Sequence, residues 1–260
     1  MGLDIYAGTL TRYYTRNWKT ITQQWAEQNG YGFRVVRPDG SGDAGVPQAA
    51  PEEVRRYMET WRDNVLQALQ SPDAPLLQPW LEDHSDTPYF TKKPDWDAFG
   101  ALLLAAACAV YGEPAPAAVE KGWNYVEHPL IVRMGGDREH VWSLFRGAEW
   151  WLPLDGGFLF RVSLPGGEER AVATVRRLHE ELDRINALLW QAGEDEILNW
   201  ETTEGYPADG SVDQDGHIDM DEDNVHTRYD TQSLAKYAFS LFWQAVRFAE
   251  THRTPLLLDY

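Results

Sequence analysis

Residues 140–164 read HVWSLFRGAEWWLPLDGGFLFRVSL, and this stretch decides the predicted fold class. It contains three short runs rich in aromatic and β-branched residues, separated by Arg-Gly-Ala at 146–148 and Asp-Gly-Gly at 155–157. Such runs with tight turns between them predict three strands in an antiparallel meander. Because strands and helices are segregated along this half of the chain, we predict an α+β fold rather than a doubly wound parallel one.

The periodicity of apolar residues predicts about five to six helices packed with this sheet. They are expected over residues 10–28, 51–69, 95–111, 115–122, 168–190 and 231–252. Strands are expected at Leu3–Tyr6 and Tyr31–Val36. The first helix has a basic outer face of Arg12, Arg16 and Lys19, while the helix over 168–190 is expected to pair Arg177 with Glu181 on its outer side.

Length and composition indicate one domain over residues 1–260, with two lobes as an alternative and a boundary in the proline-rich stretch 71–94. The single cysteine, Cys108, excludes a disulfide within the chain. Residues 1–6 match neither a signal sequence nor a myristoylation motif. The uncharged run 99–112 is too short to span a bilayer. We therefore expect a soluble cytoplasmic protein that does not bind membranes.

The net charge of −18 comes mostly from one segment. Residues 193–223 hold twelve acidic residues and no lysine or arginine, whereas the rest of the chain holds 29 acidic and 23 basic residues. Concentrated like charge repels itself unless a cation, a basic partner or solvent with salt relieves it. The same charge argues against nucleic acid as a partner, because a phosphate backbone would be repelled.

The acidic segment contains the spacing of a calcium-binding EF-hand loop. Oxygen-bearing side chains occupy places one, three, five, nine and twelve, with glycine at place six and isoleucine at place eight. The predicted metal site consists of Ser211, Asp213, Asp215, His217, Asp219 and Glu222. Serine at place one removes a charge, and the residues before the loop end helices rather than extend them. The pattern therefore resembles a bare acidic calcium loop, not a complete helix-loop-helix hand.

Three other interpretations of this segment stay open. Asp215-Gly216 favours a tight hairpin turn, which would set Asp213 opposite Ile218, Ser211 opposite Met220 and Val212 opposite Asp219. The segment could equally be a solvated acidic loop without a ligand. Finally, His217 and His226 flank the loop, and imidazole beside several carboxylates could bind a transition metal instead of calcium.

The case for an enzyme depends on carboxylates and tryptophans. Tryptophan faces stack on sugar rings, and glycoside hydrolysis needs two carboxylates, so Trp150-Trp151 and Trp200 make Glu149 and Glu201 the candidate catalytic pair. The seven histidines form no zinc motif: His179-Glu180-Glu181 lacks a second histidine, and Glu139-His140 has no partner nearby in the sequence. No nucleophile motif occurs either.

These observations favour a binding protein over an enzyme. In bulk composition alone, the chain resembles bacterial inhibitors and immunity proteins that neutralise basic toxins. We therefore expect an acidic protein that binds a calcium-like cation at 211–222 or a basic protein partner, with a carboxylate-dependent hydrolase acting on carbohydrate as the alternative.

Overall fold

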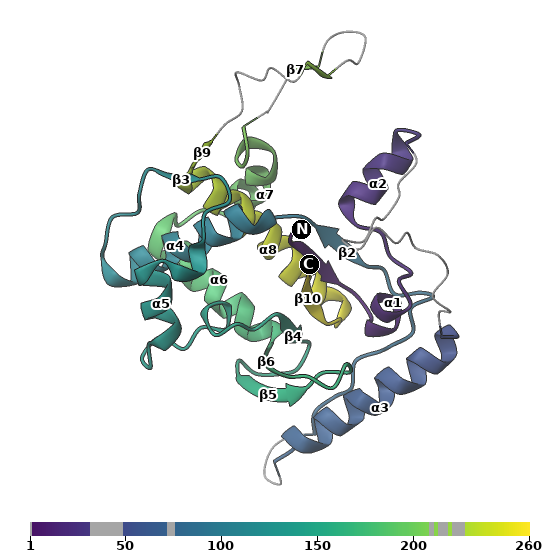
Figure 1. The fold of residues 1–260 in the computed structure, drawn as a ribbon. Coiled ribbons are helices and arrows are strands. Elements are labelled where there is room, and N and C mark those ends of the chain that lie inside the picture. The colour runs from purple at the N-terminus through teal and green to yellow at the C-terminus, as the bar shows by residue number, and fades with distance from the viewer. Residues whose placement is uncertain (1, 32–48, 72–75, 208–210, 213–217, 220–226) are drawn as a thin grey trace. The chain divides into compact units, whose positions relative to one another are not determined.

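A computed structural model describes residues 2–31, 49–71, 76–207, 211–212, 218–219 and 227–260 of the chain (Figure 1). The chain forms two compact units, each assembled from separate segments. The sheet unit comprises residues 4–93, 148–178 and 245–260, and the helical unit comprises residues 1–3, 94–147 and 179–244. The chain passes from the sheet unit to the helical unit between residues 93 and 94. This point lies at the end of the stretch 71–94, where the sequence indicates a lobe boundary.

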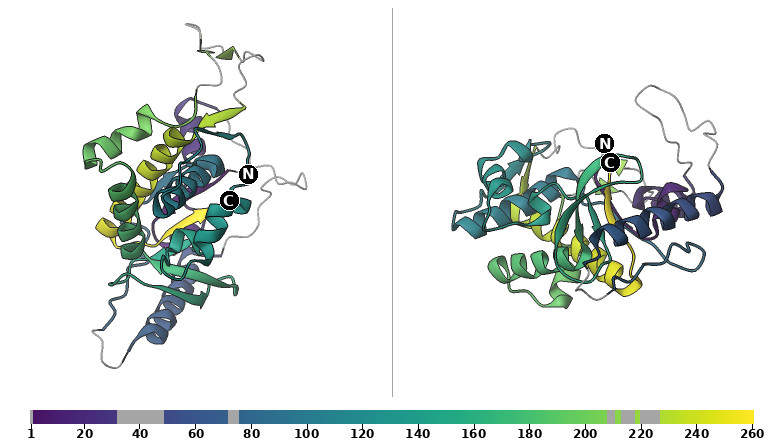
Figure 2. Two further views of the ribbon diagram at one scale, coloured as in Figure 1. Left: turned by 90° about the vertical axis from the view of Figure 1, so that its left-hand side faces the viewer. Right: turned by 90° about the horizontal axis from the view of Figure 1, so that it is seen from below.

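The sheet unit contains a six-stranded mixed sheet in the order β2-β1-β10-β4-β6-β5. Its strands are β1 (Asp4–Ala7), β2 (Phe90–Lys92), β4 (Trp150–Leu152), β5 (Leu159–Ser163), β6 (Glu169–Thr174) and β10 (Leu256–Asp259). All neighbours are antiparallel except β4 and β6, which are parallel. Figure 2 shows these strands in two further views. The first and last strands of the chain, β1 and β10, therefore pair with each other inside the sheet.

Helix α3 (Pro51–Leu69) packs its apolar stripe against one face of this sheet. Met58, Trp61 and Val65 are buried there among strand residues that include Leu257 and Val172. The indole N–H of Trp61 also donates to the Ser163 carbonyl, 2.8 Å away. Proline at the first helical position and acids in the first turn explain why the helix begins at Pro51, as predicted. The short helices α1 (Leu10–Tyr14) and α2 (Ile21–Gln28) belong to the same unit.

The helical unit is built around α4 (Asp95–Tyr111) and the first part of α8 (Thr231–His252). Phe99 of α4 stacks on Phe242 of α8, with ring centroids 5.5 Å apart. The unit also contains α5 (Pro129–Gly136), the later part of α6 (Val175–Leu189), α7 (Glu194–Thr203), the 3-10 turns η1 (Tyr125–Glu127) and η2 (Ser143–Phe145), and two small sheets formed by β3 (Ala118–Glu120) with β9 (Arg228–Asp230) and by β7 (Ser211–Val212) with β8 (Ile218–Asp219).

The structure confirms a mixed α and β protein with a mostly antiparallel sheet, but the predicted meander is wrong. Its first expected strand contains the turn η2, and the other two, β4 and β5, are separated in the sheet by β6. Residues of β6 were expected to be helical. Instead, Thr174 caps α6 by accepting a hydrogen bond from the Arg177 N–H at 3.1 Å, so the helix begins only at Val175.

Two other predicted elements differ from the structure. The helix expected over 10–28 is divided, because Arg16 adopts a positive φ of 52° and Thr20 forms a capping box with Gln23 that begins α2. The helix expected over 115–122 is strand β3, which pairs with β9. The strand expected at Tyr31–Val36 lies almost entirely outside the described residues. Within the described part, eight α-helices are present rather than five or six, and none is long and apolar enough to cross a membrane.

Candidate functional site

Helix α7 carries the described beginning of the acidic segment. Its first turn consists of Glu194, Asp195 and Glu196, and all three are exposed to solvent. Acidic residues stabilise this end of a helix, where the unpaired N–H groups leave partial positive charge. Ile197 and Trp200 anchor the helix by burial at 1% and 3% exposure. The sequence therefore folds so that these carboxylates stand on the surface while the apolar side of the helix is fixed in the core.

Two later acids contact α8: Glu201, which lies in α7, and Glu204, which directly follows this helix. Glu201 Oε2 accepts a hydrogen bond from the Gln244 amide at 2.9 Å. Glu204 Oε1 lies 3.3 Å from Lys236 Nζ in a partly exposed ion pair. Two of the five described carboxylates between 194 and 204 are thus held by α8, and the three of the first turn form the exposed acidic surface of this helix.

The predicted cation loop is described only in its flanks. Strands β7 and β8 pair antiparallel, with Ser211 opposite Asp219 and Val212 opposite Ile218. The hairpin interpretation predicted Val212 opposite Asp219, so the observed pairing differs from the predicted register by one residue. The remaining predicted ligands (Asp213, Asp215, His217 and Glu222) lie outside the described residues.

The candidate catalytic acids lie in different units. Glu149, in the sheet unit, accepts a hydrogen bond at 2.7 Å from the hydroxyl of Tyr260. Glu201, in the helical unit, accepts its bond from α8 as described above. The tryptophans that suggested sugar stacking are Trp150, Trp151 and Trp200, and they are only 7%, 0% and 3% exposed. Their ring faces are therefore part of the core, and this observation removes the stacking argument for a carbohydrate site.

A hydrogen-bonded cluster that the sequence interpretation missed is centred on Asp137, the residue that follows α5. Its Oδ2 accepts from the Tyr111 hydroxyl at 2.8 Å and lies 3.0 Å from His140 Nδ1. Its Oδ1 accepts from the backbone N–H groups of Glu139 and His140 at 2.7 and 3.2 Å. The hydrogen bond from Tyr111, followed by those from Glu139 and His140, holds the pKa of Asp137 well below its usual range.

This cluster corrects the interpretation of His140, which has a partner three residues earlier in the sequence. The contacts also have a structural role, because Tyr111 is the last residue of α4 and Asp137 directly follows α5. The Arg146 guanidinium donates to the Asp137 carbonyl as well. Arg133 lies over the Tyr111 ring, 3.8 Å from its centroid. Asp137 directly follows two glycines and lies three residues before His140. This Asp-x-x-His spacing after Gly-Gly is the sequence signal that could have indicated the turn.

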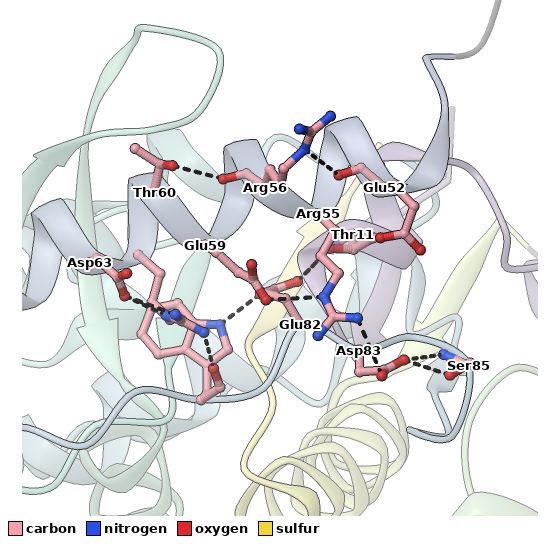
Figure 3. A network of polar contacts seen from close by, with 12 residues as sticks. Thr11, Glu52, Arg55, Arg56, Glu59, Thr60, Asp63, Glu82, Asp83 and Ser85 are labelled. Carbon is pink, nitrogen blue, oxygen red and sulfur yellow. Dashed lines mark hydrogen bonds and ion pairs between the residues drawn. The ribbon is translucent and has the colours of Figure 1, made fainter.

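A second missed group is Glu82 in the sheet unit (Figure 3). Its side chain is buried, with only 1% exposed. Its Oε2 accepts from the backbone N–H and the hydroxyl of Thr11, at 2.8 and 3.0 Å. Its Oε1 accepts from the Trp80 indole N–H at 2.7 Å. Burial raises the pKa of Glu82, although these donors oppose the rise. Both oxygens are occupied by groups of the chain, so Glu82 fastens its segment to α1 rather than serving as a general base.

Arginines complete the attachment of this segment. Arg12 donates to the carbonyls of His84 and Thr87, so it does not belong to the basic outer face predicted for the first helix. Arg62 of α3 donates to the Trp80 carbonyl at 2.5 Å. Arg55, also in α3, bridges Glu59 and Asp83 at 3.0 and 3.3 Å (Figure 3). Residues 80–87 of the proline-rich stretch are thereby fixed to α1 and α3.

Glu181 plays a similar part in the helical unit. It was expected on the outer side of α6, yet it is only 2% exposed. Its carboxylate accepts from the Ser143 N–H and hydroxyl at 2.5 and 2.8 Å, and from the Leu144 N–H at 3.2 Å. The first N–H groups of a helical turn have no acceptor within the turn itself, and Glu181 supplies one for Ser143 and Leu144 at the start of η2 from another helix. Its helical position alone could not show this, because the partner is distant in sequence.

The described histidines show no metal-binding arrangement. His128 Nδ1 accepts a hydrogen bond from the Leu130 N–H at 3.3 Å and so caps α5. His179 packs edge-on against Trp243, with ring centroids 5.3 Å apart. Across the part of the chain that the structure describes, no three His, Cys, Asp or Glu side chains are grouped so that they could hold a metal ion.

No family model, curated protein or solved structure matches this chain. The case for any function therefore depends on its own residues and their contacts.

Proposed function

We propose that this chain is an acidic binding protein whose partner is a basic protein, bound through the segment 193–223. The observation that supports the proposal is the exposed first turn of α7, where Glu194, Asp195 and Glu196 present three carboxylates at the start of a segment without lysine or arginine. In such a segment, a basic surface would relieve the mutual repulsion of the carboxylates and gain from long-range attraction.

The proposal is tested by neutralising part of this surface. A variant with Asp195→Asn and Glu196→Gln should retain less basic protein from a lysate at low salt than the unmodified chain. High salt should remove the difference, because exposed charges are screened beyond roughly 8 Å at physiological ionic strength.

A matched control is available at the start of α3. Glu52 and Glu53 are exposed acids in the first turn of a helix, so Glu52→Gln with Glu53→Gln changes the net charge equally at the same helical position. Equal loss of binding in both variants would contradict a specific role of α7. Absence of any basic protein retained by the unmodified chain at low salt would contradict the proposed function itself.

The segment 211–222 is also proposed as a cation site, with Ser211, Asp213, Asp215, His217, Asp219 and Glu222 as ligands. The pairing of Ser211 with Asp219 supports it, because this register sets the first and ninth places of the ligand pattern opposite each other. Calorimetric titration of calcium into chelator-treated protein should release or absorb heat. Asp213→Ala and Asp215→Ala should abolish this signal, and a signal unchanged by both substitutions would contradict the site.

A further inference from the structure

We draw no further inference here: the strongest candidate, the cluster of Asp137, His140 and Tyr111 at the C-terminal end of α5, carries nothing because its described contacts join the ends of α4 and α5 within the chain and none points to a ligand.

Discussion

At the scale of single residues, two buried glutamates accept hydrogen bonds from N–H groups at the start of short helical turns. Glu82 satisfies the Thr11 N–H in α1, and Glu181 satisfies the Ser143 and Leu144 N–H groups in η2. An N–H left without an acceptor in the protein interior costs about 1–3 kcal/mol. Each carboxylate therefore supplies the acceptors that a short helical turn needs, from a part of the chain far away in sequence.

Glu82→Gln should lower the free energy of unfolding by about 1–3 kcal/mol. An amide offers only one acceptor oxygen, so its NH₂ group would face either Thr11 or Trp80 donors. Urea unfolding at near-neutral pH measures the change. The exposed substitution Glu53→Gln serves as the control and should change stability by less than about 0.5 kcal/mol.

The same pair of proteins tests the direction of the Glu82 pKa. Burial raises the pKa of Glu82 in the folded state above its unfolded value, so proton binding by this carboxylate stabilises the folded chain. This stabilisation is fully present below the ordinary glutamate pKa. It is lost as the pH rises through the folded value. The stability advantage of the unmodified chain over Glu82→Gln should therefore shrink as the pH is raised from about 4. An advantage that grows over this range would show that the pKa is lowered instead.

Asp137 should show the opposite pH dependence. Hydrogen bonds from Tyr111 and its neighbours lower its folded-state pKa, so the stabilisation is present above the unfolded value and is lost as the pH falls through the folded one. Asp137→Asn should reduce the thermal midpoint at neutral pH, with a smaller reduction below about pH 4. Thermal unfolding followed by circular dichroism gives both values. Asp155→Asn, at an exposed turn position, is the control, and an equal effect of both substitutions would contradict the role of the cluster.

At the scale of elements, α4 shows how helix packing can depend on a single glycine. A Cβ atom at Gly100 would lie 2.7 Å from the Cβ and Cγ atoms of Tyr125 in η1. The Tyr125 ring is itself held by contacts with Trp96, Phe99 and Trp123. Gly100 therefore allows η1 to approach the helix closely, although glycine is a poor helix former.

Gly100→Ala should destabilise the protein by about 1–3 kcal/mol despite the better helix propensity of alanine, because Tyr125 would have to move. Urea unfolding measures the change in unfolding free energy. Gly136→Ala in α5 is the matched control, since a Cβ there meets no atom within 4 Å, and it should be neutral or slightly stabilising. A stabilising effect of Gly100→Ala would show that η1 can move away from α4 at little cost in free energy.

At the scale of the whole molecule, the net charge of −18 should make stability depend on salt. Raising sodium chloride from about 10 mM to about 150 mM shortens the screening length from about 30 Å to about 8 Å and should raise the thermal midpoint. The rise should be smaller in the Asp195→Asn, Glu196→Gln variant than in the Glu52→Gln, Glu53→Gln control. Equal rises in the two variants would show that repulsion is spread over the chain rather than concentrated in 193–223.

Long, strongly periodic helices are the part of the fold that local sequence could determine. Helices α3, α4 and α8 span the residues predicted for them, because apolar content and first-turn preferences act within one element. Two errors had readable local signals. Thr20 and Gln23 form a capping box that divides the helix expected over 10–28, and Thr174 caps α6 after a strand.

Strand neighbours and buried polar partners were decided only by the tertiary structure. The sequence by itself determined that strands and helices would be mixed, that negative charge would gather in 193–223, and where three helices begin. It could not show that β10 lies between β1 and β4, or that Glu82 and Glu181 are buried. The physical reason is the separation in sequence over which each kind of interaction acts. Propensity and capping depend on residues a few positions apart, whereas strand pairing and the burial of a carboxylate depend on donors and apolar surfaces that only the folded chain brings together.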